Sequence, residues 1–320
     1  MSIPVFDEVE YLGANPDVAA AVRDAMFQSG LEHYQKFGLA EGRSLRIQLT
    51  REAKIFHLLD RSGLGLEIGP SHNPIAPKKK GFNVHVLDHA SASDLRKKYA
   101  AHGVNLENIE EVDFIWNGQR LPELIGQTQC YDWIIASHVI EHAPDFVAYL
   151  QQCEELLKPD GLLSLVVPDK RYCFDFFSPI SSTGQVLDAH AEKRVRPSPG
   201  QIFDYVANAA KRKGEIAWTA DDGGGADALA HSLGQAHDHW ADALLSPSEY
   251  MDVHAWRFTP ASFRLIVSDL VSLGLINLEV KSEFDTKGCE FYVTLGKSKA
   301  TRPEVDRLVA LQNRMAESAL

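Results

Sequence analysis

Residues 64–88, LGLEIGPSHNPIAPKKKGFNVHVLD, constrain the fold more than any other part of this 320-residue chain. The pattern predicts a buried strand, a sharp turn at Gly69 and a second strand that ends in an acid, Asp88. Nineteen residues separate Gly69 from Asp88. This spacing suits a nucleotide-type ligand at the carboxyl ends of parallel strands, where the acid accepts the ribose hydroxyls.

The turn after Gly69 lacks the glycines that cradle a phosphate. Pro70, Ser71, His72 and Asn73 follow where a dinucleotide-binding loop would carry G-x-x-G. A pyrophosphate requires that close approach of the backbone, whereas a ligand without phosphate does not. The segment therefore favours S-adenosylmethionine (SAM) over NAD.

Strand and helix signals alternate between residues 50 and 168, which is typical of a parallel sheet covered by helices. We expect an α/β fold with a Rossmann-like, mostly parallel seven-stranded sheet, an antiparallel last strand, N-terminal helices and a long insertion after strand 5. The expected strands are 64–69, 82–88, 110–116, 131–137 and 162–168, followed by a hairpin of 276–284 and 289–297. The predicted divisions are a helical module (1–50), a SAM-binding core (51–168), a substrate-binding insertion or lid (169–257), and the rest of the core with a C-terminal helix (258–320).

The first residues predict a small helical module, with Asn15 as an N-cap and Pro16 at the first helical position. Segment 11–43 resembles a short motif found beside catalytic domains in bacterial proteins, often ones linked to polysaccharides. Docking to a partner or glycan and simple packing both remain open. In the insertion, the acidic glycine run 221–225 predicts a mobile loop.

The composition limits the classes of binding partner and indicates the cellular compartment. The net charge of -12 argues against nonspecific binding to nucleic acid, which rewards a basic surface. Four scattered cysteines without a CxxC pair predict reduced core residues, and no apolar run is long enough for a membrane span. We expect a cytoplasmic protein that acts on a small molecule or glycan; the oligomeric state stays open, with a homodimer as one option.

Five segments in order and spacing resemble a class I SAM-dependent methyltransferase of the methyltransferase-11 type. They are GLEIGPSHNPI, VHVLDHA, EVDFIW, YDWIIASHVIEHAPD and LLKPDGLLSLVVPD. The closing helix and hairpin resemble the end of that family's sheet. The likeness covers residues 60–168 and 258–296, about half of the chain.

The resemblance implies a role for each matching residue. Glu67 and Gly69 would face the methionine end of SAM, with Glu67 on its amino group directly or through water. Asp88 would bind the ribose hydroxyls, and Asp113 and Phe114 would hold adenine. Ser137 and His138 would line the floor beneath the sulfonium. The complete set expected to bind the cofactor is Glu67, Ile68, Gly69, Pro70, Asp88, His89, Asp113, Phe114, Ser137 and His138.

Residues 138–142 also match the H-x-x-E-H pattern of zinc proteases, which requires both histidines on one helix face. Here the pattern follows an apolar strand, so the histidines are expected in a turn. We therefore predict that His142 orders this turn, and we assign no metal ligands.

The acceptor chemistry is expected in the insertion, where histidine and aspartate cluster. Histidine suits a general base near pH 7, so His239 is the first candidate and His237 the second. A divalent metal site and ordinary surface histidines are the alternatives for this cluster. The residues expected to bind substrate are Lys170, Arg171, Tyr172, Trp240 and His254.

The leading hypothesis is O-methylation of a small or carbohydrate-like acceptor, in polysaccharide biosynthesis. An N- or C-methyltransferase is the first alternative, because the fold does not fix the acceptor atom. An NAD-dependent oxidoreductase and a non-catalytic SAM-binding protein are alternatives of other classes.

Overall fold

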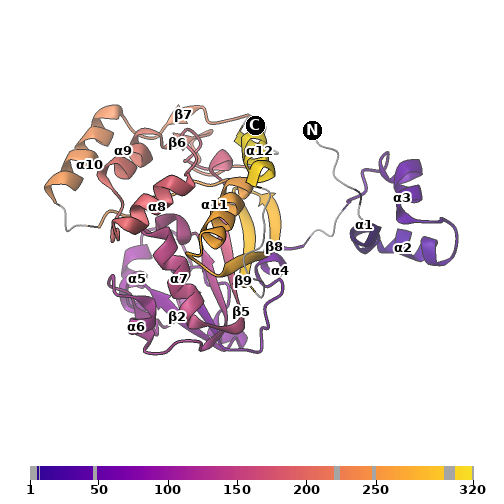
Figure 1. The fold of residues 1–320 in the computed structure, drawn as a ribbon, viewed down its shortest axis with the longest axis horizontal. Helices are drawn as coiled ribbons and strands as arrows, with labels where there is room; N and C mark the ends of the chain where they lie inside the picture. Colours follow the sequence, from indigo (N-terminus) through magenta and orange to yellow (C-terminus); the bar gives the residue numbers. More distant parts are fainter. Residues whose placement is uncertain are drawn as a thin grey trace. The chain divides into compact units, whose positions relative to one another are not determined.

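The computed structural model describes residue 6 and residues 8–45, 49–219, 224–246, 250–298 and 307–318. The chain divides into two compact units, residues 1–54 and 55–320 (Figure 1). The predicted module boundary is residue 50. Most of the glycine run predicted to be mobile, 221–225, lies outside the described residues.

The first unit is a cluster of short helices. Tyr11 is fully buried, and its hydroxyl lies 2.9 Å from Nδ1 of His33. Pro16 begins a helix as predicted, but the Asn15 side chain does not cap it. Its amide donates instead to the carbonyls of Tyr11 and Ser44, at 2.9 and 2.8 Å, and so joins two segments of the module. The elements are α1 (Glu8–Ala14), α2 (Pro16–Arg23), α3 (Gly30–His33) and the π-helix η1 (Tyr34–Gly38).

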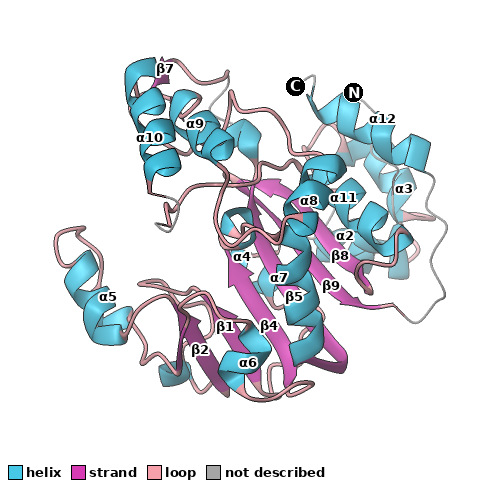
Figure 2. Ribbon diagram, turned by 60° about the vertical axis from the view of Figure 1, so that its left-hand side comes forward, coloured by secondary structure: helices cyan, strands magenta, loops and turns pink. Residues whose placement is uncertain are grey.

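The second unit is built on a seven-stranded sheet in the order β3-β2-β1-β4-β5-β9-β8 (Figure 2). Strand β9, the last in the chain, runs antiparallel to both of its neighbours, while β3, β2, β1, β4 and β5 are parallel. The predicted fold is therefore confirmed. The strands are β1 (Gly65–Ile68), β2 (Val84–Asp88), β3 (Phe114–Ile115), β4 (Tyr131–Ser137), β5 (Leu157–Pro168), β8 (Leu278–Lys287) and β9 (Glu290–Lys297).

Alternating side chains on the central strands divide the core between the two faces of the sheet. On β4, Ile134 and Ala136 pack into the larger core, whereas Trp133 and Ile135 pack into the smaller one. Helices α7 and α11 cover the larger core, and Ile55, the last residue of α4, contributes to the smaller one (Figure 2). Asp145 caps α7 by accepting the Ala148 amide at 2.8 Å. The helices of the core are α4 (Arg51–Ile55), η2 (Lys78–Lys80), α5 (Ala92–Tyr99), η3 (Leu106–Asn108), α6 (Leu121–Ile125), η4 (Ile140–His142), α7 (Phe146–Leu156), α11 (Pro260–Ser272) and α12 (Arg307–Ser318).

The insertion after β5 gathers where the parallel strands end (Figure 2). Its three main helices each begin with a serine whose hydroxyl accepts a backbone N–H, while a glutamine three residues later bonds back to the serine amide. The elements are η5 (Lys170–Tyr172), α8 (Thr183–Ala191), α9 (Pro199–Ala207), the strand pair β6 (Ala210–Lys211) and β7 (Ala228–Leu229), and α10 (Leu233–Leu245). Within the described part of the chain, no helix combines the length and the apolar character needed to cross a bilayer.

Candidate functional site

A cavity of about 420 Å³ lies at the carboxyl edge of the parallel strands. Ile68 and Leu87, near the ends of β1 and β2, form part of its wall, and Val139 contributes from the turn after β4. The insertion supplies the opposite wall through the end of α8 and Tyr250. Parallel α/β sheets bind ligands at this edge, because the loops that leave the strands converge there.

The turn at Gly69 brings the chain close to β4. Gly69 has a φ of +67°, a conformation that side chains disfavour. A Cβ atom at this position would lie 2.9 Å from Cγ2 of Val139. The Gly69 amide donates to the Leu87 carbonyl at 2.8 Å, which fixes the turn to β2. The predicted sharp turn is thus required both by backbone conformation and by close packing.

Glu67 holds the loop that follows this turn. Its carboxylate is buried and accepts the backbone N–H groups of Ile75 and Ala76, at 2.6 and 3.0 Å. Burial raises the pKa of Glu67 to about 7, although these two hydrogen bonds oppose the rise. Glu67 therefore points at the loop, while its neighbour Ile68 faces the cavity.

Asp88 joins the ends of β1 and β2. Its buried carboxylate accepts the amides of Ser71 and His89, each at 2.8 Å, and the His89 ring lies 2.6 Å away. Ser71 Oγ and His72 Nδ1 are buried and have no hydrogen-bond partner within the described ranges of the chain. Buried polar atoms are usually satisfied, so this loop has capacity to bind a polar ligand.

The adenine position requires a correction. The prediction for Asp113 and Phe114 assumed a strand over 110–116, but β3 pairs Phe114 with Leu87 and Ile115 with Asp88. Asp113 therefore lies beside Val86, before the carboxyl end, where its carboxylate contacts the Val86 amide and Lys78 Nζ, both at 2.6 Å. Neither predicted residue lines the cavity.

Trp116, and not Asp113 or Phe114, lies at the carboxyl end of β3. It lines the cavity, and its amide donates to the Asp88 carbonyl at 2.8 Å. Sequence reasoning missed this residue. The available signal was the turn sequence Asn117-Gly118 directly after it, which marks where the third strand must end.

The other residues predicted to bind the cofactor lie near the carboxyl edge of the parallel strands. Ser137 ends β4, and His138 follows with a φ of +54°. The ring of His138 lies 2.9 Å from Glu290 of β9, and His138 does not line the cavity. Val139 lines the cavity beside Gly69. Pro70 stands in the loop between the Gly69 turn and Ser71.

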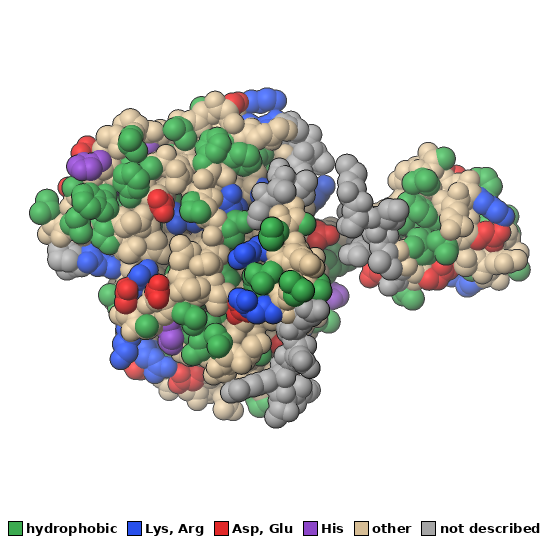
Figure 3. Space-filling view, turned by 45° about the horizontal axis from the view of Figure 1, so that its top comes forward, with side chains coloured by type: hydrophobic (Ala, Val, Ile, Leu, Met, Phe, Trp, Pro, Cys, Tyr) green, Lys and Arg blue, Asp and Glu red, His purple; other side chains and the backbone are tan. Residues whose placement is uncertain are grey.

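The predicted bases lie outside the cavity. Helix α10 buries Ala236 and Ala243, and its outer surface is exposed. His237 and His239 are on that outer surface, and the His237 ring is 5.5 Å from that of Trp240. Figure 3 shows hydrophobic side chains exposed over this end of the molecule, in keeping with the exposure of Leu244 and Leu245. No wall of the cavity is formed by α10.

The residues predicted to bind substrate lie outside the cavity. Arg171 forms an ion pair with the fully buried Asp169, at 2.6 Å. Lys170 donates to the Phe176 carbonyl at 2.8 Å, and burial lowers its pKa. Tyr172 lies in the same 3-10 turn, η5, and none of the three lines the cavity. His254, the last predicted substrate residue, is buried behind His142 of the cavity wall, with the two rings 4.7 Å apart.

The cavity has its own histidine and acid, which sequence reasoning also missed. Nδ1 of His190, at the end of α8, lies 3.0 Å from Oδ2 of Asp145 at the start of α7. Both residues line the cavity. The carboxylate orients the ring, so that Nε2 is the nitrogen available to a ligand.

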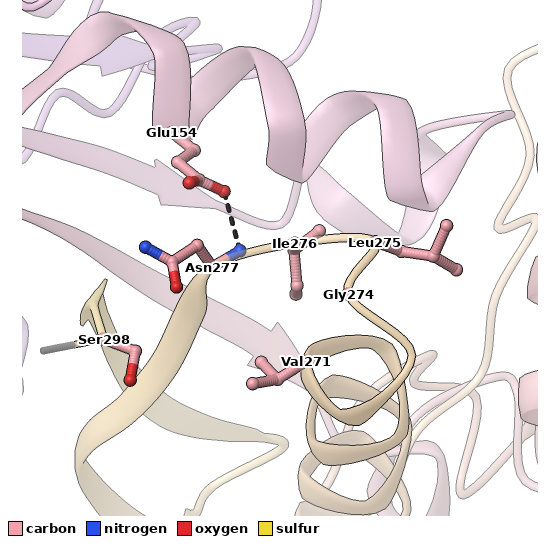
Figure 4. A pocket seen from close by; sticks show the side chains of 7 residues that line it. All are labelled: Glu154, Val271, Gly274, Leu275, Ile276, Asn277 and Ser298. Atoms are coloured by element: carbon pink, nitrogen blue, oxygen red, sulfur yellow. Dashed lines mark hydrogen bonds between the residues drawn. The ribbon is translucent and has the colours of Figure 1, made fainter. Parts of the chain in front are cut away.

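A second, smaller hollow of about 270 Å³ lies at the amino end of β5, where Glu154 accepts the Asn277 amide at 2.9 Å (Figure 4). It is remote from the strand ends that build the site.

Residues 41–258 match the family model described as methyltransferase domain. This match spans more than half of the chain, which therefore belongs to the methyltransferase domain family, as a SAM-dependent methyltransferase of class I. SAM is its cofactor. The cavity wall at the strand ends fits this group through apolar Ile68 and Leu87 and aromatic Trp116. The buried carboxylate of Asp88 lies at the end of β2, behind this wall. No curated protein matches the chain.

Several solved structures resemble the chain at low identity. A 1,6-didemethyltoxoflavin-N1-methyltransferase from Burkholderia thailandensis, with S-adenosylhomocysteine bound, has 11% identity, a TM-score of 0.37, and coverage of 93% of this chain and 94% of its own. A SAM-dependent methyltransferase from Methanosarcina mazei has 15% identity, a TM-score of 0.39, and coverage of 78% and 99%. A Rhodobacter sphaeroides protein that carries a Zn-dependent alcohol dehydrogenase name has 10% identity, a TM-score of 0.41, and coverage of 77% and 89%. At these scores, none of the three indicates a substrate.

Proposed function

We propose that this methyltransferase transfers the SAM methyl group to a hydroxyl of a small molecule. The observation that supports an oxygen acceptor is the Asp145–His190 pair on the cavity wall. A hydroxyl is a weak nucleophile until it loses its proton, and a histidine within reach can accept that proton. A free amine needs less help, because its nitrogen is a stronger nucleophile than a neutral hydroxyl oxygen and its proton can leave after the methyl transfer.

His190 replaces His239 and His237 as the proposed general base. SAM, when bound, supplies an electrophilic methyl group on its sulfonium. Trp116 would pack on the adenine, and Val139 would close the floor. Asp88, at the end of β2, would accept the ribose hydroxyls in addition to the Ser71 amide that it holds. His190 Nε2 would take the proton from the acceptor hydroxyl while Asp145 stabilises the charged ring. Holding the acceptor oxygen in line with the methyl group supplies much of the rate.

A carbohydrate-like acceptor is the narrower form of this proposal. It is supported by the resemblance of segment 11–43 to a motif linked to polysaccharides. The same resemblance supports a role in polysaccharide biosynthesis, and the four free cysteines are in keeping with a cytoplasmic protein. An N-methyltransferase remains the second candidate, because the fold does not determine the acceptor atom.

The purified protein would be incubated with SAM labelled in its methyl group and with three acceptor sets. These are hydroxylated sugars and nucleotide sugars, phenols, and primary or secondary amines. Mass spectrometry would locate the transferred methyl group. Methyl transfer to oxygen supports the proposal, and transfer to sugars supports its narrower form. Transfer confined to amines would overturn it.

A further inference from the structure

Three ionisable residues converge behind the cavity wall, and the proposed methyl transfer does not use them as a group. Glu141 and His142 belong to η4, directly after β4, and His254 comes from the end of the insertion. One potential ligand atom from each residue lies within 4.8 Å of the other two. We call these three residues the Glu141 cluster.

The Glu141 carboxylate is fully buried, and neither of its oxygens has a hydrogen-bond partner among the described residues. Three imidazole nitrogens lie close to it. Nε2 of His142 and Nε2 of His254 each lie 3.9 Å from Oε1, and Nδ1 of His138 lies 3.8 Å from it. A protonated imidazole that donated to a carboxylate would approach to about 2.8 Å. These longer separations leave a buried carboxyl group without a hydrogen bond, which is costly unless a further partner such as a cation joins the group.

Acidic side chains hold the two cluster histidines from the opposite side. Nδ1 of His254 lies 2.5 Å from Oδ2 of the buried Asp175, and Nδ1 of His142 lies 2.8 Å from Oδ1 of Asp252. A carboxylate on Nδ1 favours the tautomer that leaves a lone pair on Nε2. This applies to His254, whose Nδ1 is hydrogen-bonded to Asp175, and Nε2 of His142 lies at the same 3.9 Å distance from Glu141 Oε1 as Nε2 of His254. Histidines that bind metals have this arrangement of an outer carboxylate and an inner nitrogen.

From this geometry we infer that the Glu141 cluster binds a divalent transition-metal ion. Two imidazoles and one carboxylate suit Zn²⁺ or Fe²⁺, whereas Mg²⁺ and Ca²⁺ prefer oxygen ligands alone. In a tetrahedral site with bonds of about 2.1 Å, ligand atoms lie about 3.4 Å apart. The observed separations of 3.9 Å from Glu141 Oε1 to the two nitrogens would therefore close by about half an ångström on binding.

The backbone keeps the cluster assembled. The Glu141 carbonyl accepts the amides of Ala255 and Trp256, at 2.8 and 3.1 Å, so the segment that carries His254 is tied to η4. His142 also lines the cavity, which places the ion beside the acceptor. A hydroxyl that reached the ion would lose its proton more readily. This last consequence rests on the proposed function, whereas the metal site itself does not.

The test uses the full chain, freed of metal by dialysis against a chelator. It would be titrated with Co²⁺, whose visible absorption reports coordination, and then with Zn²⁺ as a competitor. We expect one ion per chain. Glu141→Gln and Asp175→Asn should each weaken Co²⁺ binding at least tenfold, while His102→Gln, at an exposed site outside the cluster, should leave it unchanged.

Thermal unfolding of each variant would show whether it folds. If the variants at the buried positions Glu141 and Asp175 do not fold, the test uses Asp252→Asn. The Asp252 side chain is 71% exposed, so its replacement should be tolerated. This variant should also weaken Co²⁺ binding. Absence of stoichiometric uptake by the unaltered chain would overturn the inference, as would equal uptake by folded variants. Metal uptake and methyl transfer are measured separately, so either can fail alone.

Discussion

The His190 ring is paired with Asp145, a residue 45 positions earlier in the chain, at a distance of 3.0 Å. The same carboxylate caps α7 through the Ala148 amide at 2.8 Å. One acid thus starts a core helix and orients a histidine of the insertion. This link between the core and the insertion determines which nitrogen of His190 can meet an acceptor.

Replacing His190 with alanine should lower kcat by roughly a hundredfold to ten-thousandfold, the usual contribution of a general base. SAM affinity, measured by calorimetry, should change little. His239→Ala is the matched control on the exposed surface of α10 and should retain its activity. The reverse pattern, with loss at His239 alone, would restore the assignment predicted from the sequence.

Trp116→Ala should weaken SAM binding by about tenfold, because an aromatic wall of the cavity is lost. Phe114→Ala is the comparison, since Phe114 packs in the core beside His85, with the rings 5.4 Å apart. It should lower thermal stability and leave the affinity of the folded protein nearly unchanged. Equal losses of affinity would contradict the position assigned to adenine.

Mutations at two acids of the predicted SAM site, Asp88 and Asp113, should have different effects on cofactor affinity. Asp88→Ala should weaken S-adenosylhomocysteine binding at least tenfold, because Asp88 holds the Ser71 amide and lies at the carboxyl edge. Asp113→Ala removes contacts to Lys78 and Val86, away from this edge, and should change affinity by less than about threefold. Isothermal titration of both variants checks this. A larger effect at Asp113 would show that the cofactor extends beyond the described cavity.

Glu67 should make folding stability depend on pH. In the unfolded chain this carboxyl loses its proton near pH 4.5, whereas in the folded protein burial raises its pKa to about 7. Between these values the folded state binds more protons, so stability falls as pH rises from 4.5 to 7, by about 3 kcal/mol in total. Denaturant unfolding at pH 5 and pH 8 measures the difference. Glu67→Gln should flatten this dependence, and an unchanged slope in the variant would assign it to other groups.

The sequence predicted the sheet well because its signals are local. Alternating apolar residues on strands such as β4, the cap at Asp145 and the turn at Gly69 each arise from neighbours in the chain. The length of β3 was overestimated, with a start at residue 110 in place of Phe114, because the strand is only two residues long and carries little periodicity. Trp116, one residue beyond it, was consequently overlooked.

The catalytic candidates were harder to predict because they depend on contacts between distant segments. His190 gains its role from Asp145, and His254 from Glu141, a residue 113 positions earlier. Clustering along the sequence favoured His237 and His239, but helical geometry places both on an exposed surface. Which side of a helix faces a cavity is decided by the elements packed against it, here Ala236 and Ala243 of α10 against α9.

The Glu141 carbonyl accepts two amides from the end of the insertion and so attaches that end to the core. The beginning of the insertion is attached to the core because it continues directly from β5. The amino-acid sequence of a segment that is anchored at both ends can change between the anchors while the sheet stays intact. Grafting residues 169–257 onto a related scaffold would therefore transfer His190 and His254 together, but Asp145 and Glu141 would have to be present in the recipient. Altered substrate choice in such chimaeras would depend on keeping these cross-boundary pairs matched.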